Sequence, residues 1–307
     1  MKLRIAAVAI VAAACALLLW PPRPPRDDLR ITFLDVGQGD AIVIQTPRGH
    51  TIMIDTGGRL EIGRTADGGS PAEAIGERIV VPFLIRQGIH HVDAIVLTHP
   101  HGDHAGGIAP ILRTLGADVF FDGAQEYGGH AYRDALEEAR RRHVRVVHPR
   151  AGERWSTDDG VRLRFLTSAG APLHDARDPI NENSLVVMLA CDCGRRRAFR
   201  GLFMGDAGTE SEALLLARHV DLHADVLKVG HHGSRYASSP PFLAAIQAGD
   251  AVISDGRHNL YHHPAPRTLA ALTAAHMRIW RTDRCGAVTL SVSVEAARFT
   301  TMRACQG

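Results

Sequence analysis

The chain has 307 residues, of which 45% are hydrophobic and 22% are charged. This composition is typical of a folded globular protein and excludes a disordered or fibrous chain. The formal net charge of +2 gives no overall attraction for a polyanion, so a surface for nucleic acid would need local clustering of basic residues. The length suits one large catalytic domain, because α/β enzymes often reach about 250 residues as one unit.

Residues 1–28 are predicted to be a targeting segment rather than part of the fold. Lys2 and Arg4 precede residues 5–20, which carry no charge, and a Pro-rich stretch follows. The apolar run is intermediate between a secretory signal of about 7 to 15 residues and a membrane span of about 20, so a cleaved signal peptide and a short anchor both fit. Either segment would place the domain, residues 29–307, outside the cytoplasm, as a periplasmic or secreted protein.

The predicted elements follow one another as short strands first and then as strands mixed with helices. Strands are expected at 30–34, 41–46 and 51–54, a helix at 73–87, a strand at 94–97, a helix at 104–115, a strand at 118–121, a helix at 132–142 and a strand at 144–147. The second half predicts a hairpin of 184–190 and 199–204, strands at 226–229, 251–254 and 288–294, and a helix at 267–275. Strands and helices in both halves favour a four-layer α/β/β/α sandwich.

Four cysteines lie beyond the targeting segment: Cys191, Cys193, Cys285 and Cys305. In an oxidising compartment an even count permits one or two disulfides, and the sequence leaves their pairing open.

Residues 98–107 read Thr-His-Pro-His-Gly-Asp-His-Ala-Gly-Gly and follow an apolar strand directly. In extended backbone, alternate residues face the same side, so His99 and His101 are expected to hold one ion. If a helix begins near Asp103, then Asp103 and His104 point at the same place and can hold a second ion. Imidazole and carboxylate suit zinc, manganese or iron, whereas the competing interpretation is a polar loop with Asp103 as a helix cap.

This string resembles the metal-binding motif of the metallo-β-lactamase superfamily, and other motifs of that family follow along the chain. The resemblance implies two divalent ions, zinc being favoured and manganese the alternative. Asp55 ends a strand like the motif whose Asp supports the metal loop. Asp206, in Phe-Met-Gly-Asp, resembles the Asp that bridges both ions. In the Lys-Val-Gly-His-His-Gly-Ser string one histidine would bind the second ion, His231 being favoured and His232 the alternative.

Three further strings resemble the hydrolase domain of the ComEC family of competence proteins. Residues 33–40, which contain Asp35 and Asp40, resemble its opening motif, residues 181–186 its central motif, and His262-His263-Pro264 its late His-Pro motif. The resemblance covers residues 29–295 and implies a phosphodiester substrate, DNA above all.

The chain departs from the superfamily at the third histidine of the first ion. Asn183 stands where that histidine would fall, as it does in the ComEC-like motif. The first site is therefore expected to be weaker, to be filled by water or substrate, or to be completed by His174 or His263.

Three residues have predicted roles in catalysis. Asp103 would help to hold the ion that activates water, and His263 would stabilise the developing oxyanion or protonate the leaving group. Lys228 stands out because the other lysine of the chain is Lys2, and its compact ammonium could hold a phosphate oxygen or be incidental. The arginines of residues 195–200 could contact a nucleic acid backbone or line a solvated turn.

The predicted function is therefore a metal-dependent phosphodiesterase or nuclease acting on DNA outside the cytoplasm. Its partners would be DNA or another phosphodiester, and the membrane if the N-terminal segment is uncleaved; no protein partner is predicted. Hydrolysis of a cell-wall phosphodiester, a choline-type ester or a β-lactam is the alternative. A non-catalytic metal-binding module is the alternative of a different class.

Overall fold

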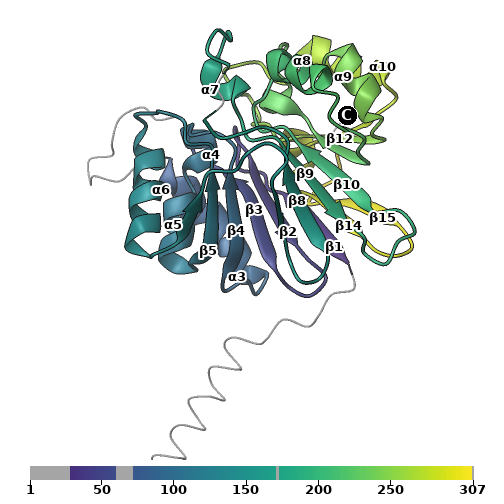
Figure 1. The fold of residues 1–307 in the computed structure, drawn as a ribbon. Helices are drawn as coiled ribbons and strands as arrows, with labels where there is room; N and C mark the ends of the chain where they lie inside the picture. The colour runs from purple at the N-terminus through teal and green to yellow at the C-terminus, as the bar shows by residue number, and fades with distance from the viewer. Residues whose placement is uncertain (1–27, 60–71, 171–172, 306–307) are drawn as a thin grey trace, which may run out of the picture.

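The strands of the protein form two sheets, which pack face to face with helices on their outer sides (Figure 1). The computed structural model describes residues 28–59, 72–170 and 173–305. The predicted targeting segment lies outside these residues except for Asp28, and its nature stays a prediction. Across the described ranges, no helix has both the length and the apolar character needed to cross a membrane.

The first sheet has eight strands in the order β15-β14-β1-β2-β3-β4-β5-β6. Strands β3 to β6 run parallel, while the pairs that join β15, β14, β1, β2 and β3 are antiparallel. Their bounds are β1 (Leu29–Phe33), β2 (Ala41–Gln45), β3 (Thr51–Thr56), β4 (Val92–Leu97), β5 (Ala117–Asp122), β6 (Arg145–Val147), β14 (Val288–Val292) and β15 (Ala297–Thr301).

The second sheet has seven strands in the order β13-β12-β11-β10-β9-β8-β7. Here β10 to β13 run parallel, and β7 to β10 pair antiparallel. Their bounds are β7 (Arg154–Ser156), β8 (Val161–Phe165), β9 (Val187–Cys191), β10 (Phe199–Phe203), β11 (Val226–Lys228), β12 (Asp250–Ile253) and β13 (Arg278–Arg281).

Helices cover the outer face of each sheet. Beside the first sheet lie α2 (Glu73–Ile75), the π-helical turn η1 (Gly76–Val80), α3 (Val81–Arg86), α4 (Gly102–Ala105), α5 (Ile108–Thr114) and α6 (His130–Arg141). The second half carries α7 (Pro179–Glu182), α8 (Thr209–Ala217), the short 3₁₀ turn η2 (Gly230–Gly233), α9 (Pro240–Ile246), α10 (Pro266–Ala274) and α11 (Thr282–Cys285).

Three hydrophobic cores hold these layers together. One lies between the sheets, one joins the first sheet to α3, α5 and α6, and one joins the second sheet to α8, α9 and α10. Strand β4 shows the pattern, because Ala94 and Val96 face the inter-sheet core while Ile95 and Leu97 face the helices. A strand buried on both faces needs a continuous apolar run, which is what its sequence has. The predicted four-layer sandwich is confirmed.

The helix predicted at 104–115 is interrupted, and the prediction of one continuous element was wrong. It consists of α4 and α5, with Gly106 and Gly107 between them. At Gly107 a Cβ atom would lie 2.3 Å from the carbonyl oxygen of Thr56, so a glycine is required where the helices press on β3. The sequence did not predict strands β7, β8, β13 and β15 or helices α7, α8, α9 and α11.

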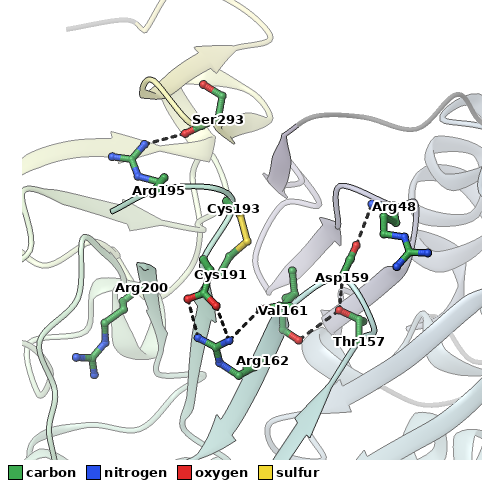
Figure 2. Close-up of a disulfide and its surroundings, with 12 residues drawn as sticks. Arg48, Thr157, Asp159, Val161, Arg162, Cys191, Cys193, Arg195, Arg200 and Ser293 are labelled. Carbon is green, nitrogen blue, oxygen red and sulfur yellow. Dashed lines mark hydrogen bonds and ion pairs between the residues drawn. A yellow bond between two sulfur atoms is a disulfide. The ribbon is translucent and has the colours of Figure 1, made fainter. Parts of the chain in front are cut away.

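The four cysteines form two disulfides, Cys191–Cys193 and Cys285–Cys305. The first lies at the β9–β10 hairpin, where Arg162 donates two hydrogen bonds to Asp192 (Figure 2). The second ties α11 to the segment that follows β15.

Removing the Cys285–Cys305 disulfide is expected to lower the free energy of unfolding. The bond joins residues 20 apart in sequence, and a loop of this length restricts the unfolded chain by about 3 kcal/mol. Urea unfolding of the Cys285→Ala, Cys305→Ala double variant, compared with the parent protein in the absence of reductant, measures this difference. Equal free energies of unfolding would contradict the expectation.

Candidate metal centre

The predicted site residues meet where parallel strands of both sheets end. Asp55 lies at the end of β3, His99 follows β4, Asp206 follows β10, and His231 and His232 follow β11. The carboxyl ends of parallel strands are the usual position of binding sites in open α/β sheets. Residues far apart in sequence are therefore brought to one place by the topology.

Asp206 is the centre of this cluster. Its carboxylate oxygens lie 3.4 Å from Nε2 of His104 and 3.3 Å from Nε2 of His232. Nε2 of His99 and Nε2 of His231 are each 3.9 Å away. One buried carboxylate thus faces four imidazoles, an arrangement suited to a bridging ligand between two ions.

Asp103, His104 and His232 lie together with Asp206 on one side of the centre, called the second side because the sequence predicts the second ion there. Oδ2 of Asp103 lies 3.8 Å from Nε2 of His104 and 3.6 Å from Nε2 of His232. All are buried. Of the two histidines considered for this position, the geometry favours His232, because its ring nitrogen groups with the ligand atoms of Asp103 and His104 within 4.8 Å.

Asp55 aligns the metal-binding loop without facing the centre. It accepts hydrogen bonds from the backbone N–H and the hydroxyl of Thr98, at 2.8 and 2.7 Å, and its other contact is Nδ1 of His104 at 2.8 Å. The contact with Nδ1 turns Nε2 of His104 toward Asp206. This is the supporting role that carboxylates commonly play behind a metal-binding histidine.

Carboxylates and imidazoles that are buried together shift one another's pKa in this pocket. Burial lowers the pKa of His232, but the carboxylates of Asp206 and Asp103 outweigh it and raise that pKa to about 10. Burial also opposes protonation of His104, yet Asp206, Asp55 and Asp103 raise its pKa well above the usual value. For Asp206, burial favours the neutral acid, and the imidazolium charges of His232 and His104 nevertheless hold its pKa well below the usual range.

Several polar atoms at the centre are buried and lack hydrogen-bond partners among the described residues. They include Nε2 of His104, Nε2 of His232 and Oδ1 of Asp206. Leaving a buried polar atom unpaired is costly, so such atoms are normally paired with protein, water or an ion. Two imidazole nitrogens and a carboxylate oxygen that converge are suitable ligands for a divalent cation. The residues present therefore fit the metal ions that the sequence predicts.

The first side of the centre, where His99 and His101 are predicted to hold an ion, contains fewer ligand groups. Nε2 of His99 lies 3.1 Å from Nδ1 of His101 and 3.9 Å from Asp206. Burial and the positive charge of His104 lower the pKa of His99 well below its usual value, which leaves its ring neutral and able to act as a ligand. Nε2 of His231 lies near the carboxylate of Asp206 as well, and it is 3.3 Å from the side-chain nitrogen of Asn181.

Asn183 does not face this group. Its side chain donates to the carbonyl of Pro179 and accepts from the backbone N–H of Leu173 at 2.6 Å. It lines a cavity of about 400 Å³ together with His174, beside the loop that contains Gln125. Asn181 is the asparagine whose side chain reaches the centre.

Asp40 and Lys228 form a buried ion pair behind the second side. The ammonium of Lys228 contacts the carboxylate of Asp40 and donates to the carbonyl of Gly205 at 3.3 Å. The other oxygen of Asp40 lies 3.7 Å from Nδ1 of His232. Both side chains are shielded from solvent. Lys228 therefore neutralises the buried carboxylate of Asp40 and is not placed to hold a substrate phosphate. Asp35 lies apart and pairs with Arg303 at 3.3 Å.

His263 lies at the edge of the centre, against His231 at 5.6 Å between ring centroids. Burial, together with the positive charges of His231 and His232, lowers its pKa to about 4. The ring is then neutral near pH 7, where it can donate a hydrogen bond from one nitrogen but holds no extra proton. This favours stabilisation of an oxyanion over protonation of a leaving group, two roles that the sequence left open.

The arginines of residues 195–200 lie away from the centre, because the β9–β10 hairpin is at the other end of the strand that leads to Asp206. Arg195 donates to the carbonyl of Ser293 at 2.9 Å (Figure 2). Arg197 and Arg200 pair with carboxylates of the same region. The arrangement favours a structural turn over a nucleic-acid surface.

Comparison with known proteins agrees with this geometry. Residues 34–180 match the family described as the Metallo-beta-lactamase superfamily. The chain carries a metallo-β-lactamase domain. The predicted superfamily is thereby confirmed, and the domain is that of a metallohydrolase superfamily in which divalent ions are expected. Their identity is not fixed by the fold.

The relatives of this metallo-β-lactamase domain include competence proteins, as predicted. It is 30% identical over 263 residues to ComE operon protein 3 of Bacillus subtilis (strain 168), covering 84% of this chain and 32% of that protein. It is 28% identical over 269 residues to Competence protein ComA of Neisseria gonorrhoeae, covering 87% of this chain and 33% of that protein. The chain thus spans about a third of the length of these relatives.

A solved structure supports the fold alone. CmlA, a diiron β-hydroxylase from Streptomyces venezuelae, superposes with a TM-score of 0.51 at 13% sequence identity, over 92% of this chain and 55% of that one.

Two residues beside the centre were missed by the sequence analysis. Asn181 contacts His231, and the carboxylate of Glu182 accepts hydrogen bonds from the backbone N–H groups of Gly208 and Ser211, which fixes the loop after Asp206. Both belong to the string at residues 181–186 that resembles the central motif of the ComEC family. The resemblance of that string to a family motif was the one signal in the sequence that could have placed Asn181 and Glu182 beside the centre.

Proposed function

We propose that this protein is a metal-dependent phosphodiesterase that cleaves DNA outside the cytoplasm. The observation that carries the proposal is the convergence of buried, unpaired ligand atoms around Asp206. Nε2 of His104, Nε2 of His232 and Oδ1 of Asp206 have no hydrogen-bond partner among the described residues. A group of this kind suits a catalytic centre better than a purely structural one, since His231 and His263 leave an edge with partial exposure.

The proposed ligands divide between two sides of Asp206. His99 and His101 would hold one ion, and Asp103, His104 and His232 the other, with Asp206 shared between them. When bound, divalent ions supply a water of lowered pKa and stabilise negative charge on phosphoryl oxygens. Zinc is the favoured metal and manganese the alternative, because imidazole and carboxylate ligands suit both.

The protein's own residues would orient the reacting groups. Asp55 holds His104 in the orientation that presents Nε2, and Lys228 offsets the charge of Asp40. The neutral ring of His263 would donate a hydrogen bond to an oxygen of the phosphodiester as charge develops on it. Because Asn183 stands where a third histidine is usual in the family, water or substrate would fill the remaining position of the first ion.

The substrate is proposed from the relatives. The chain matches a protein named Competence protein ComA and another named ComE operon protein 3, and competence concerns the uptake of DNA. The absence of a third histidine at Asn183 argues against the β-lactam alternative. A location outside the cytoplasm is supported by the two disulfides, because such bonds persist in oxidising compartments.

A substrate panel tests the proposal. The full chain is assayed with zinc and with manganese on single-stranded DNA, duplex DNA, a generic phosphodiester and a β-lactam. We expect cleavage of DNA that a chelator stops and that His101→Ala abolishes. His91→Ala is the matched control, because His91 lies before β4, at the other end of that strand from the centre, and pairs with Asp118. Hydrolysis of the β-lactam without cleavage of DNA would overturn the proposal, as would equal cleavage by the His101→Ala variant.

A further inference from the structure

The edge of the metal centre is rich in tyrosine. The chain has four tyrosines, and three of them lie on loops around the centre: Tyr127, Tyr236 and Tyr261. The fourth, Tyr132, is buried on α6 and donates to Asp122 at 2.9 Å. Tyr127 packs against the core between the first sheet and its helices, whereas Tyr236 and Tyr261 belong to none of the three cores and call for a reason other than packing.

Tyr261 is the tyrosine whose ring is best placed for a ligand. Its side chain is 49% exposed, and it stacks on His263 with 5.7 Å between centroids and an interplanar angle of 26°. His263 in turn lies against His231, with 5.6 Å between ring centroids, so the tyrosine lies at the edge of the metal centre. The neighbouring Leu260 is 87% exposed.

Arg235 supplies a positive charge at the same edge. It is exposed, and within the described residues its guanidinium makes no hydrogen bond or ion pair. It lies two residues after Gly233, whose carbonyl accepts a hydrogen bond from the backbone N–H of Ala265 at 2.8 Å, so the segments that contain Arg235 and His263 run side by side. An unpaired arginine beside a phosphodiester-cleaving centre is suited to a phosphate oxygen.

Tyr127 lies at the side of the first metal position. Its ring meets His101 edge to face, with 5.2 Å between centroids, and it is half-buried. Tyr236 has the guanidinium of Arg177 over one face of its ring at 3.8 Å. Of the three tyrosines, Tyr261 is the most exposed and stacks on His263 at the edge of the centre, so it is the best candidate for substrate binding.

We propose that Tyr261 and Arg235 form a nucleotide-binding edge, in which Tyr261 stacks on an unpaired base and Arg235 binds an adjacent phosphate. The inference rests on the proposed function, and it adds that the substrate is a single-stranded segment of nucleic acid. Stacking on an aromatic ring requires a base that is not enclosed in a duplex, and it tolerates any sequence because every base has a π face.

Binding of a single-stranded oligonucleotide with phosphorothioate linkages, which resist hydrolysis, tests the proposal in the presence of manganese. The measurement is the fluorescence anisotropy of the labelled strand, repeated with an abasic strand of the same length. Because a base stacked on an aromatic ring gains affinity from that contact, Tyr261→Leu is expected to raise Kd for the base-bearing strand about tenfold. Kd for the abasic strand should not change, and Tyr261→Phe should bind like the parent.

Arg235→Gln is expected to weaken binding of both strands and to reduce the dependence of Kd on salt, because one phosphate contact is lost. Arg218→Gln is the matched control, since Arg218 is an exposed arginine at the far end of α8. Equal effects of Tyr261→Leu on both strands, or none on either, would overturn the inference, as would failure of the parent to bind either strand. Binding that depends on Tyr261 without any cleavage of DNA would support the inference and overturn the proposed function.

Discussion

Replacing His232 with alanine is expected to lower kcat/KM by about a thousandfold and to remove about one bound ion per chain. The ion on this side would lose the imidazole that lies 3.3 Å from Asp206 and 3.6 Å from Asp103. Metal ions stabilise transition-state charge by several kcal/mol, and each 1.36 kcal/mol corresponds to about a factor of ten in rate. Steady-state kinetics and the metal content of the purified variant measure the two effects.

His231→Ala is the comparison that makes this result specific. His231 is 3.9 Å from Asp206 and contacts Asn181, so its loss should leave the ion held by Asp103, His104 and His232 in place. Loss of that ion in His231→Ala, with retention in His232→Ala, would reverse the assignment.

Replacing Lys228 with methionine is expected to lower the free energy of unfolding by about 3 to 5 kcal/mol, because it leaves the buried carboxylate of Asp40 without its partner. Lys228 is fully buried, and Asp40 is 1% exposed. Methionine keeps most of the volume of the lysine side chain, which separates the loss of charge from the loss of packing. Urea unfolding followed by circular dichroism measures the difference.

The double variant Lys228→Met, Asp40→Asn is the control for this interpretation. It removes both charges, so it should recover a large part of the stability lost in Lys228→Met. Unfolding of Lys228→Met at the same urea concentration as the parent would contradict a stabilising role of the Lys228–Asp40 pair. A double variant that is no more stable than Lys228→Met would contradict it as well.

Much of the fold was predictable because the strands that are buried on both faces have continuous apolar sequences. Strand β4 and the histidine string that follows it are the clearest case. The missed strands β7 and β15 are short or exposed, and they carry little hydrophobic pattern. The break between α4 and α5 depends on contact with Thr56, a residue distant in sequence.

The site was predictable as a set of motifs but not as a set of side-chain directions. Two adjacent histidines at a strand end have no fixed orientation in sequence, and here both adopt left-handed backbone angles, with φ of 46° for His231 and 52° for His232. Which ring points at Asp103 follows from that local turn. In the same way, Asn183 stands where a third histidine is usual, but its side chain braces a loop through Leu173, and Asn181, two positions earlier, contacts the centre instead.

Lys228 shows how composition and structure can point to different roles. Its rarity in an arginine-rich chain suggested a special function, and phosphate binding was one interpretation. The ammonium is instead buried against Asp40 and the carbonyl of Gly205. Burial depends on the packing of β11 between its neighbours in the second sheet, which no local sequence pattern reveals.

The central claim is that the buried cluster around Asp206 binds catalytic divalent ions. Native mass spectrometry of the full chain, purified without chelator, tests it most directly. We predict a mass increase that corresponds to at least about one zinc or manganese ion per chain and that Asp206→Ala removes. A protein that carries less than one ion per chain, also after incubation with zinc or manganese, would contradict the claim.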